Sequence, residues 1–285
     1  MKTFLLSMAG AFVAILLFLI VAFMGLATII GAASAPDSQP DEIVLTLDLR
    51  GEFTDQAPTS GFAAFSGVVG FTDLLVKLDR ARADEGVKGI LIRGSEMGVG
   101  SSRAEELRDA LLDFKQSGKF VIAHSQGSFS PGPSSFRAIS AADEIWMQPG
   151  TDMSISGVSF ETPFLKDMLD SLSITAEFEA IGEFKNAPNT FLETTYTEPH
   201  RLALADLADS LWTVSIADIA ADRSVDPSDL RSTLEASIYS AEEFLQLGLV
   251  DQLGWPEDAR EAARERAGDS AEFVSLVGYE APTVP

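Results

Sequence analysis

Apolar residues recur in a strand–helix–strand pattern along the chain after residue 42. Short apolar runs over Ile43–Leu49, Val87–Ile92 and Phe120–Ala123 predict buried β-strands. Between them, apolar residues at helical spacing predict one helix that ends before Gly86 and a second helix over Glu105–Lys115. Because helices that join successive strands in this way return the chain to a parallel neighbour, the pattern predicts an α/β domain with a parallel sheet flanked by helices.

The pattern continues in the second half of the chain. Phe136–Ala142 and Phe164–Leu172 predict helices, and Glu144–Met147 predicts a short strand. Ile174–Ile181 alternates between apolar and polar residues, which predicts a strand that leads directly into residues 182–188. A last helix is predicted over residues 257–267.

The amino-terminal end has a different pattern, with no charged residue between Lys2 and Asp37. Phe4–Ile30 is almost entirely apolar, which is long enough to cross a hydrocarbon core of about 30 Å. A cleaved signal peptide has an apolar core of only about 7 to 15 residues, although Ala33-Ser34-Ala35 resembles a cleavage site. Length favours a retained transmembrane helix. We therefore predict a membrane anchor over residues 1–33, a Pro-rich linker over 34–41 and one domain over 42–285.

Lys2 is the only charge before this apolar segment, so the positive-inside rule places the amino terminus in the cytoplasm and the domain on the outer, periplasmic side. The net charge of −23 argues against nucleic acid as a partner. The chain has no cysteine, which excludes disulfides and thiol catalysis. Its two histidines, His124 and His200, are far apart in sequence, so spacing predicts no metal site. A Ser-His-Asp hydrolase would have to use one of these two.

Residues 182–188 have the sequence GEFKNAP and contain a candidate catalytic lysine, Lys185. A lysine acts as a general base only when it is neutral, which requires an apolar environment. Ile181, Phe184 and Phe191 are candidates for that environment. The alternative is a solvated lysine on a surface turn.

Ser125 is the second candidate, because it follows the predicted strand Phe120–Ala123 after a single residue. Ligands of α/β proteins bind beyond the carboxyl ends of parallel strands, which is where a serine at this position would lie. The alternative is a helix N-cap, which also favours serine.

The ordered set of motifs resembles the signal peptide peptidase A family, the protease IV type of membrane-anchored serine protease. The set runs from the amino-terminal apolar segment to about Gly254, and its members are Ser125-Gln126-Gly127, Ile145-Trp146, Ser154–Val158, Gly182–Ala187, Tyr239–Glu243 and Leu247–Gly254. The resemblance implies the ClpP/crotonase fold, preceded by one transmembrane helix.

The resemblance also implies a Ser/Lys dyad. The lysine of the family's Gly-x-Tyr-Lys-x-Ala motif is its general base, and Lys185 stands at that position. The family's nucleophile lies in Ser-Gly-Gly, and Ser125 is aligned with it. This chain departs from the motif with Ser125-Gln126-Gly127, where a side chain at position 126 would crowd an oxyanion site. Longer members of the family have an amino-terminal half with the anchor and the lysine and a carboxy-terminal half with the serine, and this chain is similar to the amino-terminal half.

These implications give the expected function of a serine endopeptidase of the bacterial inner membrane that degrades cleaved signal peptides. This chain would supply Lys185, and the serine would come from Ser125 or from a serine-bearing half. The family also implies a homo-oligomer or association with such a half, and no cofactor. The alternative function is a catalytically silent subunit that binds peptide or supports assembly. A third interpretation, an acyl-thioester enzyme of the crotonase type, is disfavoured by the anchor and by the lack of an evident adenine-nucleotide loop.

Overall fold

The computed structural model describes residues 10, 12–13, 15–25, 40–57, 68–97, 99–128, 132–155, 157–235 and 238–281. The chain divides into two compact units, residues 1–41 and 42–285, and each is treated by itself. Most of the predicted anchor (1–33) and of the linker (34–41) lies outside the described residues. Within the first unit, residues 15–25 are helical and their side chains are exposed. No helix among the described residues is long and apolar enough to cross a membrane.

The second unit contains, among its described residues, a six-stranded sheet in the order β10-β1-β4-β5-β6-β9. Every neighbouring pair in this sheet is parallel. Its strands are β1 (Ile43–Asp48), β4 (Val87–Arg93), β5 (Phe120–Ser125), β6 (Glu144–Met147), β9 (Gln252–Leu253) and β10 (Glu272–Ser275). The predicted α/β class with a parallel sheet is confirmed.

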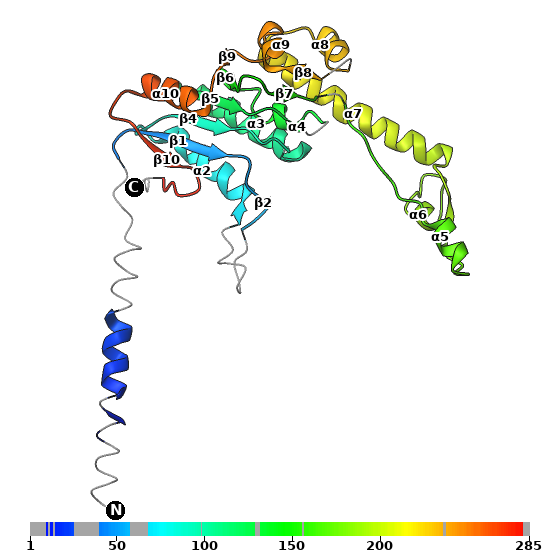
Figure 1. Cartoon of the computed structure of the whole chain (residues 1–285), viewed down its shortest axis with the longest axis horizontal. Helices are drawn as coiled ribbons and strands as arrows, with labels where there is room; N and C mark the ends of the chain where they lie inside the picture. Colours follow the sequence, from blue (N-terminus) through cyan, green and yellow to red (C-terminus); the bar gives the residue numbers. More distant parts are fainter. Residues whose placement is uncertain are drawn as a thin grey trace, which may run out of the picture. The chain divides into compact units, whose positions relative to one another are not determined.

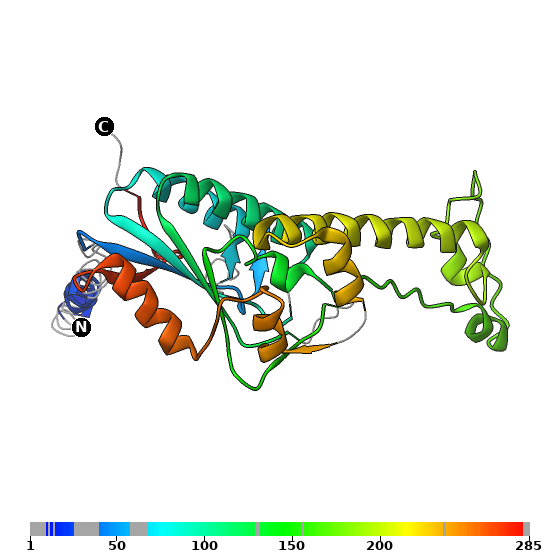
Figure 2. The same ribbon diagram turned by 90° about the horizontal axis from the view of Figure 1, so that it is seen from above.

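Helices cover both faces of this sheet (Figures 1 and 2). On one face, side chains such as Leu45, Ile90 and Val121 form a large core with α2, α3 and α7, whereas Val44, Leu91 and Ile122 face α10 on the other. The helices are α2 (Phe71–Ala83), α3 (Ser101–Gln116), α4 (Ser134–Arg137), α5 (Lys166–Ser171), α6 (Asn189–Leu192), α7 (Glu198–Arg223), α8 (Pro227–Leu234), α9 (Ala241–Gln246) and α10 (Pro256–Ala267). Two small ribbons complete the unit, a parallel pair of β2 (Phe53–Thr54) with β3 (Val69–Gly70) and an antiparallel pair of β7 (Asp152–Met153) with β8 (Tyr239–Ser240).

Two predicted elements are wrong. Ile174–Ile181 forms no strand, because its backbone pairs with no other strand among the described residues. The helix predicted over Phe136–Ala142 instead begins at Ser134 and ends at Arg137, and turns follow it up to residue 141.

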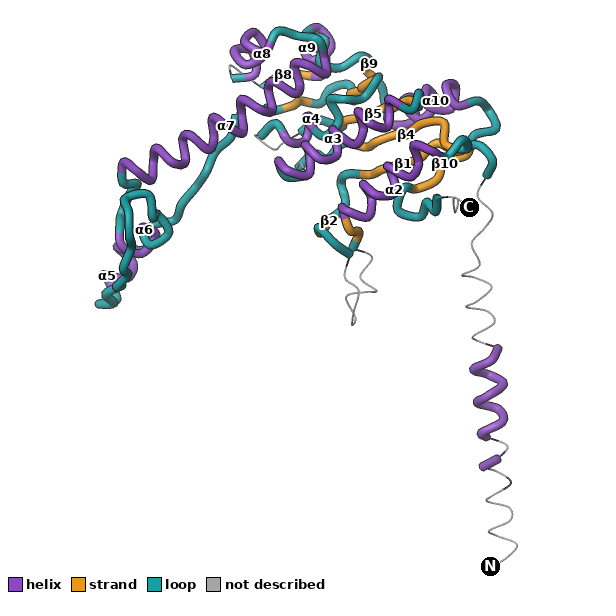
Figure 3. Tube along the Cα trace, turned by 180° about the vertical axis from the view of Figure 1, so that it is seen from behind, coloured by secondary structure: helices purple, strands orange, loops and turns teal. Residues whose placement is uncertain are grey.

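α7 is the longest helix of this unit and has two differently packed parts. Thr197 caps its first turn by accepting a hydrogen bond from the His200 amide, and Pro199 favours the start of a helix. Its buried apolar residues, Trp212, Ile216, Ile219 and Ala220, all lie in the second half. The first half extends away from the sheet, and Figures 1 and 3 show α5 and α6 beside it. We call residues 158–197 and the first half of α7 the arm.

Aromatic rings hold the arm together. The rings of Phe164 and Tyr196 meet edge to face with centroids 5.1 Å apart, and the Tyr196 and His200 rings are 5.0 Å apart. The Tyr196 hydroxyl also accepts a hydrogen bond from the Thr162 amide at 3.0 Å. These contacts fix α5 and α6 to the start of α7 rather than to the sheet.

Candidate active site

Ser125 is the last residue of β5, because this strand continues two residues past the end predicted at Ala123. The side chain is only 4% exposed. Its Oγ accepts a hydrogen bond from the Gly127 amide at 3.2 Å and lies 3.5 Å from the Gly127 carbonyl oxygen. The hydroxyl therefore closes its own turn, as serine side chains do when they stabilise local backbone. It is not the N-cap of a helix.

Gly127 allows this turn to pack closely against Thr151 and Asp152. Its φ of +89° lies in the left-handed region, and a Cβ placed on it would stand 2.5 Å from the Asp152 carbonyl oxygen. Asp152 also accepts a hydrogen bond from the Ser128 amide at 3.1 Å. Only glycine suits both the conformation and the contact, so the last glycine of the Ser-x-Gly motif has a clear structural role.

Gln126, which replaces a glycine of the family motif, points to three neighbouring side chains at the carboxyl end of the sheet. Its amide nitrogen donates to the Gln148 side-chain oxygen at 3.0 Å. Its side-chain oxygen accepts from the guanidinium of Arg93 and lies 3.5 Å from that of Arg50. These contacts join residues at the ends of β1, β4, β5 and β6, so Gln126 closes over the strand ends.

The convergence of Arg50 and Arg93 on Gln126 was not predicted from the sequence. The signal was the repeated Arg-Gly at two strand ends, Arg50-Gly51 and Arg93-Gly94. Arg50 also pairs with Asp48, and this hydrogen bonding holds the pKa of the Asp48 carboxyl below its usual range. Arg93 forms no ion pair with any described residue.

His124 precedes Ser125 but cannot serve as its base. Alternation along β5 turns it to the opposite face, where its Nε2 donates to the Gly254 carbonyl oxygen at 3.1 Å. The ring is 1% exposed, and burial lowers the pKa of His124 because the charged form loses its water. His200 lies in the arm, where its ring contacts those of Tyr196 and Phe164. Neither histidine contacts Ser125, so the described residues contain no Ser-His pair at this position.

Lys185 lies in the arm, in the loop between α5 and α6, and its side chain is exposed. Gly182 has a φ of +87°, and its carbonyl oxygen accepts a hydrogen bond from the Lys185 amide at 3.2 Å. The two neighbours expected to form an apolar environment do not enclose it in the described structure: Ile181 is 97% exposed and Phe184 58% exposed. Phe191 instead stacks on Phe178, with ring centroids 5.5 Å apart.

The structure does not bring Ser125 and Lys185 together within the chain. Ser125 ends a central strand of the sheet, whereas Lys185 belongs to a loop of the arm, and no described interaction joins the two. Figures 1 to 3 agree that α5 and α6, which flank the lysine loop, lie away from β5. The described part of the chain also contains no group of His, Cys, Asp or Glu side chains that could hold a metal ion.

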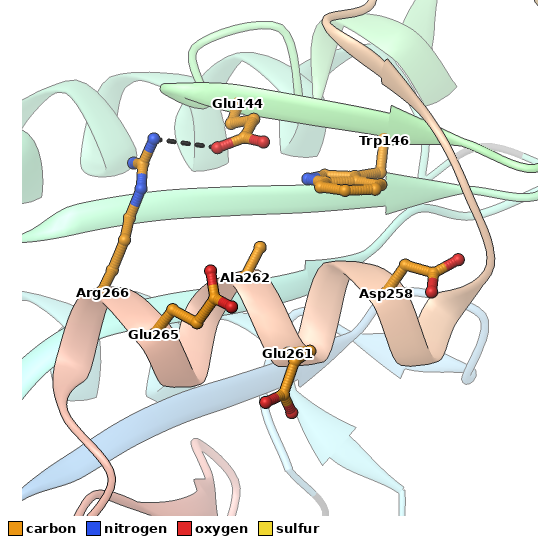
Figure 4. A pocket seen from close by; sticks show the side chains of 7 residues that line it. All are labelled: Glu144, Trp146, Asp258, Glu261, Ala262, Glu265 and Arg266. Carbon is orange, nitrogen blue, oxygen red and sulfur yellow. Dashed lines mark hydrogen bonds and ion pairs between the residues drawn. The ribbon is translucent and has the colours of Figure 1, made fainter.

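A separate groove of about 510 Å³ lies between β6 and α10 (Figure 4). Its lining residues are Glu144, Trp146, Asp258, Glu261, Ala262, Glu265 and Arg266. The Arg266 guanidinium donates to Glu144 at 2.8 Å, and Asp258 accepts from the Trp255 amide at the start of α10. The groove contains neither a serine nor a lysine, so it offers no Ser/Lys chemistry.

Comparisons with known proteins give one family. Residues 113–269 match the sequence profile of peptidase family S49. The chain is 21% identical to the chloroplastic serine protease SPPA of Arabidopsis thaliana, with 79% of this chain and 32% of that protein covered. It is 24% identical to Protease 4 of Salmonella typhi, with 88% of this chain and 44% of that protein covered. The chain thus spans less than half the length of either relative. Among solved structures, a ClpP1 mutant from Listeria monocytogenes is 11% identical, with 77% of this chain and 94% of that chain covered and a TM-score of 0.45.

Proposed function

The chain belongs to peptidase family S49, and from this premise we propose that it supplies the general-base lysine of a serine endopeptidase that degrades cleaved signal peptides. Membership confirms the family resemblance drawn from the motifs. The relatives named as proteases support peptide substrates. Because the chain spans less than half the length of those two relatives, the complete activity belongs to the proposal.

One observation carries the assignment of the lysine rather than the serine to this chain. The Ser125 hydroxyl is buried and bound within its own turn, whereas the Lys185 side chain is exposed and open to a partner. A nucleophile must present its oxygen to a carbonyl carbon, and Ser125 would have to break its turn to do so. Lys185 needs no such rearrangement to reach a serine brought by a second half or a second subunit.

The reaction follows the resemblance. Neutral Lys185 would take the proton of the partner's serine hydroxyl while the oxygen attacks the peptide carbonyl carbon, and backbone N–H groups would stabilise the oxyanion. A partner surface that covers Ile181 and Phe184 would remove water from around the lysine, which favours its neutral form. Assembly would therefore complete the site and activate the base in one step.

The test is labelling with a fluorophosphonate serine probe, followed by mapping of the tagged residue. We expect no tag on the 285-residue chain alone and a tag on the partner's serine after a carboxy-terminal half is added. A tag on Ser125 in the lone chain would overturn the assignment and indicate a self-sufficient protease.

Three substitutions, one of them a control, sharpen this test in the assembled enzyme. Lys185→Ala should abolish cleavage of a peptide substrate, whereas Lys166→Ala, an exposed lysine of the same arm, should leave cleavage unchanged. Ser125→Ala should be nearly silent. Unchanged turnover by the Lys185 variant would remove this lysine from the mechanism.

A second candidate function is a catalytically silent subunit that binds peptide or supports assembly. The observation that favours it is the closure of the strand ends by Gln126, where the family motif has a glycine. The discriminating result is the probe experiment: no tag in any mixture with a serine-bearing half, together with peptide binding, would favour the silent subunit.

We further propose a single-pass anchor in the bacterial inner membrane with residues 42–285 on the periplasmic side, assembly as a homo-oligomer or with a serine-bearing half, and the ClpP/crotonase type of fold. The apolar run Phe4–Ile30 and the family resemblance support these three points. Alkaline carbonate extraction tests the anchor: the full chain should stay in the membrane pellet, and release of the full chain into the supernatant would contradict a retained anchor.

A further inference from the structure

Two guanidinium groups converge at the carboxyl end of the sheet. Arg93 is the last residue of β4, and Arg50 lies two residues beyond β1. Their strands are neighbours, and Arg93 is in register with Asp48. Both guanidiniums point to the side-chain oxygen of Gln126, so a single neutral acceptor lies between two cations.

Only one of these two guanidiniums has a direct ion pair among the described residues: Asp48 pairs with Arg50, whereas Arg93 has no carboxylate within ion-pair distance. Two carboxylates act on the arginines from nearby, Asp48 on Arg93 and Glu96 on Arg50. The Arg93 guanidinium donates a hydrogen bond to the Gln126 side-chain oxygen, and a guanidinium has five N–H donors. Arg93 therefore keeps donors for a further acceptor.

We propose that Arg93, with Arg50, binds the carboxylate of a peptide, namely its free carboxy terminus; the choice of a peptide rests on the function proposed above. The planar fork of a guanidinium matches a carboxylate with two parallel hydrogen bonds. The place is also the edge of a parallel sheet where α/β proteins bind ligands. The net charge of −23 disfavours polyanions at long range, whereas an apolar peptide with one terminal carboxylate meets little repulsion.

The alternative is that Arg93 merely holds Gln126 in place. Gln126→Glu separates the two roles, because it sets a carboxylate of the chain itself between the arginines. Gln148 can turn its amide by half a rotation to donate to the new carboxylate, so the local hydrogen bonds are kept. If the arginines form a carboxylate site, this variant is folded and its site is already filled.

The experiment measures binding of the full 285-residue chain to a labelled apolar peptide by fluorescence anisotropy. One peptide has a free carboxy terminus, a second has the same sequence with a terminal amide, and a third has the amide and one internal glutamate. We expect the free acid to bind about tenfold more tightly than the amide. This factor corresponds to the weakest hydrogen bonds made by charged groups, as suits a half-exposed site. If the glutamate peptide equals the free acid, the site reads any carboxylate and the preference for chain ends is wrong.

Variants test the residues. Arg93→Gln should weaken binding of the free acid about tenfold and leave the amide unchanged, and Gln126→Glu should remove the difference between the two peptides. The matched control is Arg201→Gln, which removes one exposed positive charge on α7 and should change neither affinity. Equal binding of acid and amide by the unaltered chain would overturn the proposal. If Arg93→Gln does not fold, the binding of the two peptides to Gln126→Glu tests the proposal instead, because this variant retains both arginines.

No peptide bond is cut in this experiment. Loss of the difference between acid and amide would reject the carboxylate site while leaving Lys185 chemistry untouched. Conversely, failure of the serine-probe test would reject the proposed function without affecting the binding measured here.

Discussion

Arg137 is the most informative residue for testing how α7, and with it the arm, is fixed to the sheet domain. Its side chain is 2% exposed. The guanidinium donates from Nε to Asp218 of α7 at 2.7 Å and lies 3.2 Å from the Glu105 carboxylate of α3. Asp222 of α7 accepts from Arg108 of α3 at 2.6 Å and from the Ser140 hydroxyl at 2.6 Å. Charged groups of α3, α4 and α7 thus meet in one buried network.

The substitution Arg137→Met retains an apolar stem of similar length and removes the charge. Breaking a buried ion pair on one side costs about 3–5 kcal/mol, because the remaining charge is left without its partner. Asp218 is 22% exposed and still pairs with Arg108 at 3.3 Å, so we expect a cost at the lower end of this range. We expect a loss of about 3 kcal/mol in the free energy of unfolding.

The assay is urea denaturation of the full chain in mild detergent, followed by far-ultraviolet circular dichroism and by tryptophan fluorescence, since Trp212 lies buried on α7. The control is Arg231→Met, whose partners Asp209 and Glu235 are exposed and whose loss should cost at most about 1 kcal/mol. Because the double variant Arg137→Met/Asp218→Leu removes both charges, it should lose less than the sum of its single changes. A loss for Arg137→Met no larger than the control's would refute the reasoning.

Three further predictions concern the strand end and the arm. Gly127→Ala should lower the free energy of unfolding by more than about 2 kcal/mol, since it adds a clash with the Asp152 carbonyl to a positive φ. Gly118→Ala, with a similar φ and no atom within 4 Å of the added Cβ, should lower it by only about 1 kcal/mol. Equal losses would contradict the clash. Burial lowers the pKa of His124, so on acidification the unfolded chain binds a proton at this residue at a higher pH than the folded chain does. The free energy of unfolding should therefore fall as the pH drops below about 6.5, by at most about 1.4 kcal/mol per pH unit. His124→Gln should remove this part of the pH dependence, and identical slopes would exclude His124 as its source. Hydrogen exchange should be fast for the amides of residues 175–181, which donate no backbone hydrogen bond within the described part of the chain, and slow for those of Val87–Arg93; comparable protection would contradict the unpaired segment.

Four strands of the central sheet, β1, β4, β5 and β6, could be predicted from the sequence because each contains a short, mostly apolar run that is largely buried. The edge strands β9 and β10 were not predicted, because they are short and partly exposed. Val87–Arg93 and Phe120–Ser125 illustrate this, and the predicted ends were wrong by only one or two residues. Periodicity failed near a buried charged side chain: the helix expected over Phe136–Ala142 ends at Arg137, whose guanidinium pairs with Asp218 of α7 and Glu105 of α3. Nothing in the sequence pairs Arg137 with Asp218, because the two are 81 residues apart.

The candidate site was harder to predict, since its motif residues are fixed by contacts distant in sequence. Ser125 and Gly127 follow from local rules, namely a strand end and a tight turn. The partners of Gln126 come from three other strand ends, and spacing alone does not align Arg50, Arg93 and Gln148. The role proposed for Lys185 comes from the family resemblance and not from periodicity, since its side chain is exposed in a loop of the arm.

The segment Ile174–Ile181, wrongly predicted as a strand, lies directly before residues 182–188, which contain the lysine of the proposed function. Its alternation is a strand signal, and a strand needs both a hydrogen-bonding partner and a surface for its apolar face. The segment has no strand partner among the described residues, and although Phe178 stacks on Phe191, the side chains of Ile174, Phe178 and Ile181 are about half or more exposed. A sequence rarely maintains large exposed apolar side chains without a surface to cover them. The same segment leads to Lys185, the motif residue that is open to solvent, whereas Ser125 is closed within the sheet. This asymmetry is the physical reason for our proposal that this chain supplies the lysine and not the serine.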